Sequence, residues 1–110
     1  MKITVKDEPE QLVIALSGDD NTQDNVEEFK RIMEQARDRT SQTPVVLDIT
    51  NLYYLGSEGV GIIAAAHKAF SERKFKLIVR NPTRQVSRVF MVTRLDSFLH
   101  IQREDGGPPK

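Results

Sequence analysis

The stretch Val45–Ile63, VVLDITNLYYLGSEGVGII, joins two apolar runs through a segment that contains glycine and a single serine. Its first five residues are aliphatic and mostly β-branched except for Asp48, which is typical of a strand buried in the middle of a sheet. The pattern after Ser57 predicts a helix that extends to about Ser71, because apolar residues recur on one helical face. These residues are Val60, Ile63, Ala64, His67 and Phe70.

The remaining face of this predicted helix also carries few polar side chains before Lys68. It presents Ile62, Ala65, Ala66 and Ala69. A helix that is apolar most of the way round is either buried on two sides or meets a partner.

The rest of the chain alternates strand and helix patterns. Strands are predicted at residues 2–6, 12–16, 75–79 and 98–102, and a helix that ends at about Thr40 follows the second of them. Asn81 and Pro82 predict the N-cap and first residue of a third helix, which ends at about Thr93. The order β-β-α-β-α-β-α-β indicates an α/β fold, with a mixed β-sheet covered by helices.

The length of 110 residues predicts a single domain, which we place at residues 1–103, with residues 104–110 as a disordered tail. No run of 18 apolar residues and no secretory signal occurs, so we expect a cytoplasmic protein without a membrane span. The chain has no cysteine, and His67 and His100 lack the spacing of metal ligands. We therefore expect neither a metal nor a cofactor.

Charge is unevenly distributed along the chain. Residues 1–58 hold 12 acids and 6 bases, whereas residues 59–110 hold 4 acids and 10 bases. Seven bases and no acid occur from Arg73 to Arg94. This basic segment is either a solvated rim or a footprint for phosphate or nucleic acid. Because only two aromatic residues accompany it, we favour the rim and expect no direct nucleic-acid partner.

The glycine and serine residues invite three chemical interpretations. Residues 59–64 match G-x-G-x-x-A, but the preceding strand ends near Ile49 and no acid follows at the required distance, so a small enzyme or nucleotide-binding domain is disfavoured. A nucleophile elbow needs glycine where Leu55 stands. Two roles remain for Ser57. Its side chain either caps the helix or accepts a phosphate beside the positive helix end, and the two roles are compatible.

The run from Val46 to Gly61 resembles the signature of the STAS domain of anti-sigma factor antagonists. In that signature a strand ending L-D-L-S leads through an apolar pair to D-S-S-G-L-G and a helix. The similarity covers nearly the whole chain, since Leu16–Asp19 resembles the L-x-G-E turn of the family. Likewise, Val86–Phe90 resembles its V-x-R-x-F helix.

The resemblance implies a regulatory protein rather than an enzyme, which acts by partner switching in signal transduction and transcription regulation. The unmodified form is expected to bind a serine kinase that is also an anti-sigma factor. Phosphorylation of Ser57 would break that complex, and a PP2C-type phosphatase would restore it. The residues expected to bind the partner are Asp19, Asn21, Gly56, Ser57, Glu58, Val60, Gly61 and Ile62.

Three positions depart from the family pattern. Gly56 and Asn21 stand where the family commonly has aspartate, and Glu58 replaces the second serine. These departures keep a second interpretation open, in which the chain is a non-phosphorylated STAS scaffold subunit of a signalling assembly or of a lipid ABC transporter. The sequence leaves the oligomeric state open, a homodimer included.

Overall fold

The structure is a computed structural model that describes residues 1–20, 22–39 and 42–103. Asn21 and the predicted tail at 104–110 lie outside the described residues. In chain order the elements are β1 (Lys2–Asp7), β2 (Leu12–Gly18), α1 (Gln23–Arg37), β3 (Val45–Leu52), α2 (Ser57–Glu72), β4 (Leu77–Arg80), α3 (Arg84–Val92), the 3-10 helix η1 (Leu95–Ser97) and β5 (His100–Gln102). The predicted α/β class and order of strands and α-helices are confirmed, and η1 is an addition.

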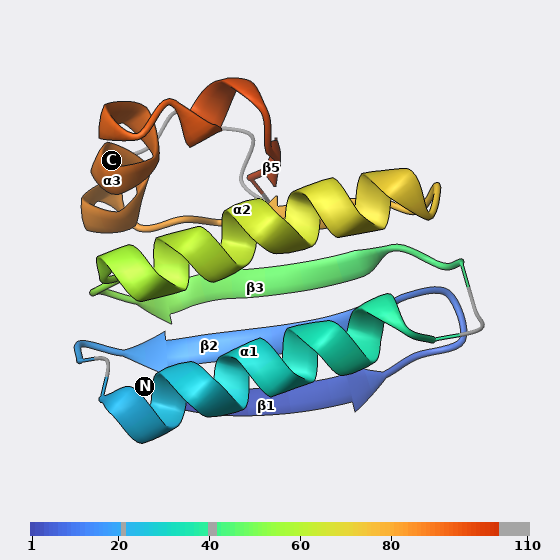
Figure 1. Cartoon of the computed structure of the whole chain (residues 1–110). Coiled ribbons are helices and arrows are strands. Elements are labelled where there is room, and N and C mark those ends of the chain that lie inside the picture. Colours follow the sequence, from blue (N-terminus) through green and yellow to red (C-terminus); the bar gives the residue numbers. More distant parts are fainter. Residues whose placement is uncertain (21, 40–41, 104–110) are drawn as a thin grey trace.

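One five-stranded sheet with the order β1-β2-β3-β4-β5 organises the molecule. The β1 strand pairs with β2 in the antiparallel sense, and the pairs β2–β3, β3–β4 and β4–β5 are parallel. The helices α1 and α2 lie side by side across one face of the sheet (Figure 1). Each parallel step needs a crossover connection, and helices provide these connections.

The core lies between the sheet and these helices. The parallel register aligns Leu12 with Val45, and Val45 with Leu77, so that alternate residues of three strands point to the same side. Aromatic and aliphatic side chains of the helices pack against this side of the sheet. The fully buried members of the core include Ile14, Leu47, Val79, Phe29, Ile63, Phe70 and Phe90.

The start of α3 differs from the prediction. Asn81 has φ 54°, in the left-handed region that asparagine tolerates, and it turns the chain at the end of β4 instead of capping a helix. The N-cap is Thr83, whose Oγ1 accepts a hydrogen bond from the Val86 backbone N–H at 3.4 Å. The same hydroxyl donates to the Leu52 carbonyl oxygen at 2.7 Å. The two hydrogen bonds of Thr83 therefore fix the start of α3 at Arg84, two positions after Pro82.

The last two strands are shorter than predicted. Lys74 has φ 66°, so the chain is still turning there, and β4 begins at Leu77 rather than at Phe75. The predicted strand at 98–102 begins only at His100, because the chain first forms η1. Phe98 consequently lies outside the sheet, and its side chain is 63% exposed.

The buried face of α2 is also rotated relative to the prediction. It consists of Gly59, Ile63, Ala66 and Phe70. Ala64 and His67, which were expected on that face, are only half-buried. The sheet lies beneath α2 and α1 packs along one side of it. The most buried residues therefore come from both predicted faces of the helix, Ile63 and Phe70 from one and Ala66 from the other. The His67 ring instead lies 6.0 Å from the ring of His100, centroid to centroid.

Candidate functional site

Three helices begin at the same edge of the sheet, which we call the carboxyl edge. Because β2, β3 and β4 are parallel, the loops after them leave the sheet at this edge (Figure 1). The loops are joined directly, since the Tyr53 backbone N–H donates to the Gly18 carbonyl oxygen at 2.8 Å. The bond from Thr83 to Leu52 adds the start of α3 to the same edge. The positive ends of three helix dipoles therefore converge here.

Ser57 occupies the first residue of α2, and the N-cap before it is Gly56. Glycine has no side chain that could accept a hydrogen bond from the first turn, whereas Thr22 and Thr83 do so for α1 and α3. The Ser57 side chain is exposed, and its hydroxyl makes no hydrogen bond to another described residue. The interpretation of Ser57 as the helix cap is therefore wrong, and its hydroxyl is open to other chemistry.

Two leucines hold the loop that presents Ser57. Leu52 is 0% exposed and Leu55 is 5% exposed, so both anchor in the core. Between them Tyr53 and Tyr54 project outward, with 49% and 50% of their surface exposed. Sequence reasoning missed these tyrosines, although four consecutive apolar or aromatic residues cannot all face one core. Exposed tyrosines are typical of protein interfaces.

The other residues predicted to bind a partner divide into two groups. Asp19 is exposed in the loop after β2, and Glu58 is exposed in the first turn of α2, so both lie at the carboxyl edge. Gly61 and Ile62 lie one turn further along α2, on the side that faces α1. Val60 is half-buried against the core and contributes little surface. Asn21 lies outside the described residues.

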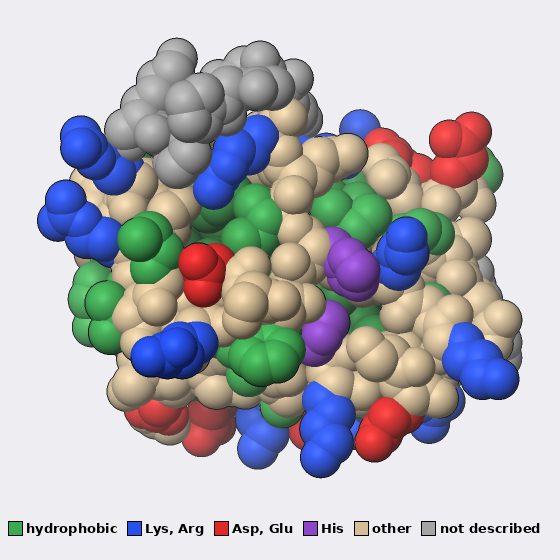
Figure 2. All heavy atoms as spheres, turned by 90° about the horizontal axis from the view of Figure 1, so that it is seen from above, with side chains coloured by type: hydrophobic (Ala, Val, Ile, Leu, Met, Phe, Trp, Pro, Cys, Tyr) green, Lys and Arg blue, Asp and Glu red, His purple; other side chains and the backbone are tan. Residues whose placement is uncertain are grey.

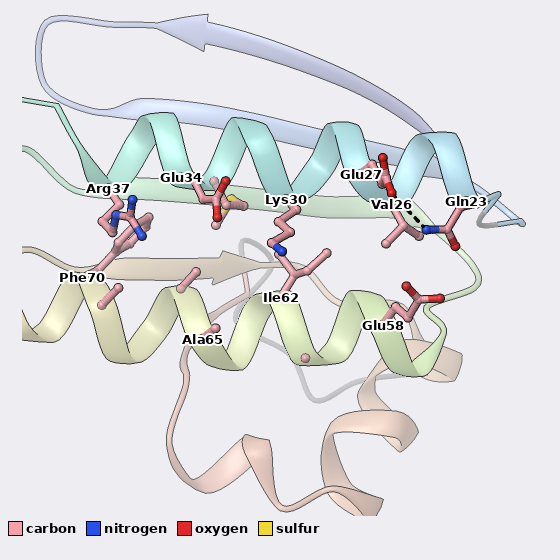
Figure 3. A pocket seen from close by; sticks show the side chains of 14 residues that line it. Gln23, Val26, Glu27, Lys30, Glu34, Arg37, Glu58, Ile62, Ala65 and Phe70 are labelled. Carbon is pink, nitrogen blue, oxygen red and sulfur yellow. Dashed lines mark hydrogen bonds between the residues drawn. The ribbon is translucent and has the colours of Figure 1, made fainter.

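A groove of about 410 Å³ runs between α1 and α2, and we call it the α1–α2 groove (Figure 3). Apolar residues form its floor, and charged residues from both helices form its rim. Figure 3 shows Glu58 facing Gln23 at one end and Arg37 beside Phe70 at the other. The apolar lining consists of Val26, Met33, Gly61, Ile62, Ala65, Ala66, Ala69 and Phe70. Sequence reasoning identified the α2 side of this groove but not the α1 side.

The rim of the groove has an excess of negative charge. Arg37 donates to both carboxylate oxygens of Asp38, from Nε at 2.9 Å and from the terminal nitrogen at 3.1 Å. These hydrogen bonds lower the pKa of Asp38 and raise the pKa of Arg37. Asp38 is shared with Arg73, whose terminal nitrogen lies 3.6 Å from its carboxylate. The charges of the rim itself are the carboxylates of Glu27, Glu34 and Glu58, the ammonium of Lys30 and the guanidinium of Arg37. Three negative charges and two positive charges leave an excess of one negative charge.

Residues 1–20, 22–39 and 42–103 contain neither a cluster of metal ligands nor a membrane-spanning helix. No three or more histidine or acidic side chains in these ranges gather in a way that could hold a metal ion. None of the helices formed by these residues combines the length and the apolar character that crossing a membrane requires.

A comparison with known protein families identifies the family of this chain. The family described as "Mlab, STAS domain" matches residues 3–101. The resemblance inferred from the motifs is therefore confirmed, and the chain belongs to the STAS domain family. Among curated proteins, the anti-sigma-B factor antagonist of Listeria monocytogenes is 27% identical over 60 residues, which are 54% of this chain. The chain spans about half the length of that relative, with 53% of it covered.

Solved structures share the fold at low sequence identity. The anti-sigma factor antagonist SpoIIAA in its unphosphorylated form has a TM-score of 0.79 and 21% identity, over 94% of this chain and 90% of that chain. The phosphorylated form of SpoIIAA, a Bacillus cell fate determinant, has a TM-score of 0.74 and 20% identity, over 94% of each chain. The mixed sheet with its helices is thus the STAS fold.

The geometry of Ser57 predicts that its hydroxyl is dispensable for folding. We expect Ser57→Ala to change the free energy of unfolding by less than about 0.5 kcal/mol, because no intramolecular hydrogen bond is lost. The matched variant Thr83→Ala removes a side chain that does cap a helix, and we expect it to cost about 1–2 kcal/mol. Urea denaturation measures both. Equal losses for the two variants would contradict the position assigned to Ser57.

Gly61 offers a second test. It is exposed in the interior of α2, and a Cβ atom added there would meet nothing within 4 Å. Since glycine destabilises a helix interior, we expect Gly61→Ala to raise the free energy of unfolding by about 0.5–1 kcal/mol. Gly18→Ala is the control and should be destabilising, because Gly18 has φ 115° and its Cβ would lie 3.4 Å from the Met1 Cα. A loss of stability in Gly61→Ala would show an internal contact at this site.

Proposed function

We propose that the chain is a phosphorylation-controlled switch of the anti-sigma factor antagonist type. In the unmodified state it binds a serine kinase that is also an anti-sigma factor, through the carboxyl edge and the first turns of α2. The kinase then phosphorylates Ser57 and the complex dissociates, until a PP2C-type phosphatase removes the phosphate. The observation that carries this proposal is an exposed serine hydroxyl at a helix start whose N-cap residue offers no side-chain acceptor.

The local geometry suits a phosphate on Ser57. The first-turn N–H groups of α2 and its helix dipole favour negative charge at this position, so the phosphoserine is stabilised within the folded chain. The hydroxyl is accessible to a kinase because Ser57 is exposed and its loop is held outward by Leu52 and Leu55. Phosphorylation therefore requires no unfolding.

The same phosphate opposes docking. The surface around Ser57 presents Tyr53, Tyr54 and the apolar start of the α1–α2 groove, which a partner would cover. A phosphate adds about 1.5 to 2 negative charges to this contact, next to the carboxylate of Glu58. Burying that charge without a cation from the partner costs several kcal/mol, so the complex weakens. The proposal is also supported by membership of the STAS family and by the named roles of the relatives.

One observation favours a second candidate. Glu58 places a permanent carboxylate in the first turn of α2, and Gly56 provides no carboxylate beside the serine. A chain in which Glu58 occupies the electropositive helix start needs no phosphate there. It would then serve as a non-phosphorylated scaffold subunit of a signalling assembly or of a lipid ABC transporter. Its docking surface would be the same, and only its regulation would differ.

The decisive experiment is phosphorylation by the serine kinases encoded in the same genome. We expect one of them, with ATP, to transfer a single phosphate to Ser57, as located by tandem mass spectrometry. The Ser57→Ala variant is the control and should remain unmodified. If every kinase leaves Ser57 free of phosphate, the scaffold function replaces the switch.

Partner binding separates the effect of charge from that of size. Ser57→Asp and Ser57→Asn introduce side chains of nearly the same shape, and only the first is charged. With a partner isolated by pull-down from the host, calorimetry should give an affinity for Ser57→Asp that is at least about tenfold weaker than for Ser57→Asn. Equal affinities of the two variants would exclude an electrostatic switch.

A further inference from the structure

The outer side of α3 carries an exposed surface that contains none of the residues expected to bind the switch partner. Val86, Ser87 and Phe90 bury the inner side of this helix. On the opposite side Arg84, Arg88 and Val92 follow one another at intervals of four residues, with Met91 beside them. We call these four residues the α3 ridge.

The α3 ridge combines apolar surface with positive charge. Met91 is 62% exposed and Val92 is 82% exposed, and Phe98 nearby is 63% exposed. Figure 2 views the molecule from the side where α3 and η1 lie, and hydrophobic side chains there reach the surface between Lys and Arg side chains. Three large exposed hydrophobic residues within one short segment exceed the scattered exposure that is normal for a monomer. A complementary surface should be apolar and acidic.

The α1–α2 groove of the same chain has these properties. Its floor is apolar, and its rim carries an excess of one negative charge, because three carboxylates stand beside two cations. Gly61 adds room, because nothing lies where its Cβ would be and an approaching helix meets no side chain there. An amphipathic helix in an apolar groove is a recurrent mode of protein recognition.

The dimensions of the two surfaces agree. The nine residues of α3 span about 14 Å at the rise of an α-helix. The part of the groove from Gly61 to Phe70 covers nine residue steps of α2, which is also about 14 Å. A chain cannot fill its own groove in this way, because the inner side of α3 is fixed in the core by Val86 and Phe90.

We propose that the protein associates with itself head to tail, with the α3 ridge of one copy seated in the α1–α2 groove of the next. Arg84 and Arg88 face the glutamates of the rim, and Met91 and Val92 cover the alanine floor. The contact joins two different surfaces, so each added copy leaves one groove and one ridge free, and short chains or rings form. The contact is small, so association is weak and depends on concentration.

This inference goes beyond the switch and stands without it, since neither phosphate nor a second protein is involved. The two are connected through Glu58, Gly61 and Ile62, which line the groove and also belong to the expected partner-binding residues. A copy seated in the groove excludes the switch partner from those residues. Self-association would therefore lower the concentration of protein that is free to bind the switch partner.

Sedimentation velocity of the purified full chain tests the proposal. The weight-average mass of the wild type should rise at least about twofold between about 10 µM and 1 mM, and the rise should shrink at high salt. Arg88→Glu reverses a ridge charge, and the double variant Gly61→Gln and Ala65→Gln fills the groove at two exposed positions. Both should remain monomeric, whereas Lys2→Glu, with the same change in net charge as Arg88→Glu, should behave as the wild type.

Mixing the two monomeric variants gives the sharpest readout. The Arg88→Glu variant keeps an intact groove and the glutamine variant keeps an intact ridge, so an equimolar mixture should form a heterodimer and stop there. A mixture that stays monomeric would overturn the head-to-tail contact, as would a wild type that is monomeric at 1 mM. A monomeric wild type that sediments with phosphatidylserine vesicles would likewise overturn it and assign the ridge to a membrane. Circular dichroism melts check that each variant is folded.

Discussion

The parallel alignment of β2, β3 and β4 is the constraint on which the rest of the structure depends. It places the carboxyl ends of three strands at one edge, and it places the first turns of three helices there as well. The register is held by buried aliphatic residues, because a slip of one residue would turn Val45 and Leu47 away from the core. At the edge, the bonds from Tyr53 to Gly18 and from Thr83 to Leu52 join the three loops. The site is therefore a consequence of topology.

The helix α2 has two roles that explain its unusual composition. One side, with Ile63 and Phe70, closes the core over the sheet. The side with Ile62 and Ala65 lines the α1–α2 groove. Small residues on that side keep the groove open, and Gly61 keeps it open at some expense of helix stability. From its sequence, this helix is expected either to be buried on two sides or to meet a partner. In the structure α2 is buried on one side and lines an open groove on another.

Much of the fold follows from local patterns. Short apolar runs, alternation, helical spacing and the Asn81-Pro82 signal located the strands and α-helices, because these patterns are properties of single elements. Element ends were less accurate. Asn81 and Thr83 are both good N-cap residues, and only the Leu52 carbonyl, brought close by the fold, selects Thr83. Similarly, the buried face of α2 depends on where α1 packs, which a single helix cannot reveal.

The site was predictable where a motif carries it and not where tertiary packing creates it. The strand, turn and helix around Ser57 are contiguous, so its exposed place at a helix start follows from the sequence. The α1–α2 groove unites residues more than thirty positions apart, such as Glu27 and Glu58, and no local pattern indicates that they meet. The outward position of Tyr53 and Tyr54 depends on which neighbours fill the core.

If recognition takes place at the carboxyl edge, the opposite edge of the sheet serves as an internal reference. That opposite edge consists of the turn at Glu8–Gln11, Pro44 and the turn at 73–76, joined through Leu12 and Val45. The most direct measurement is an NMR titration of the ¹⁵N-labelled chain with its isolated partner. We predict that the perturbed amide signals belong to residues 53–62 and to the loop after Gly18. Perturbation centred on residues 8–11 and 73–76, with the signals of Ser57 and its neighbours unchanged, would contradict recognition at the carboxyl edge.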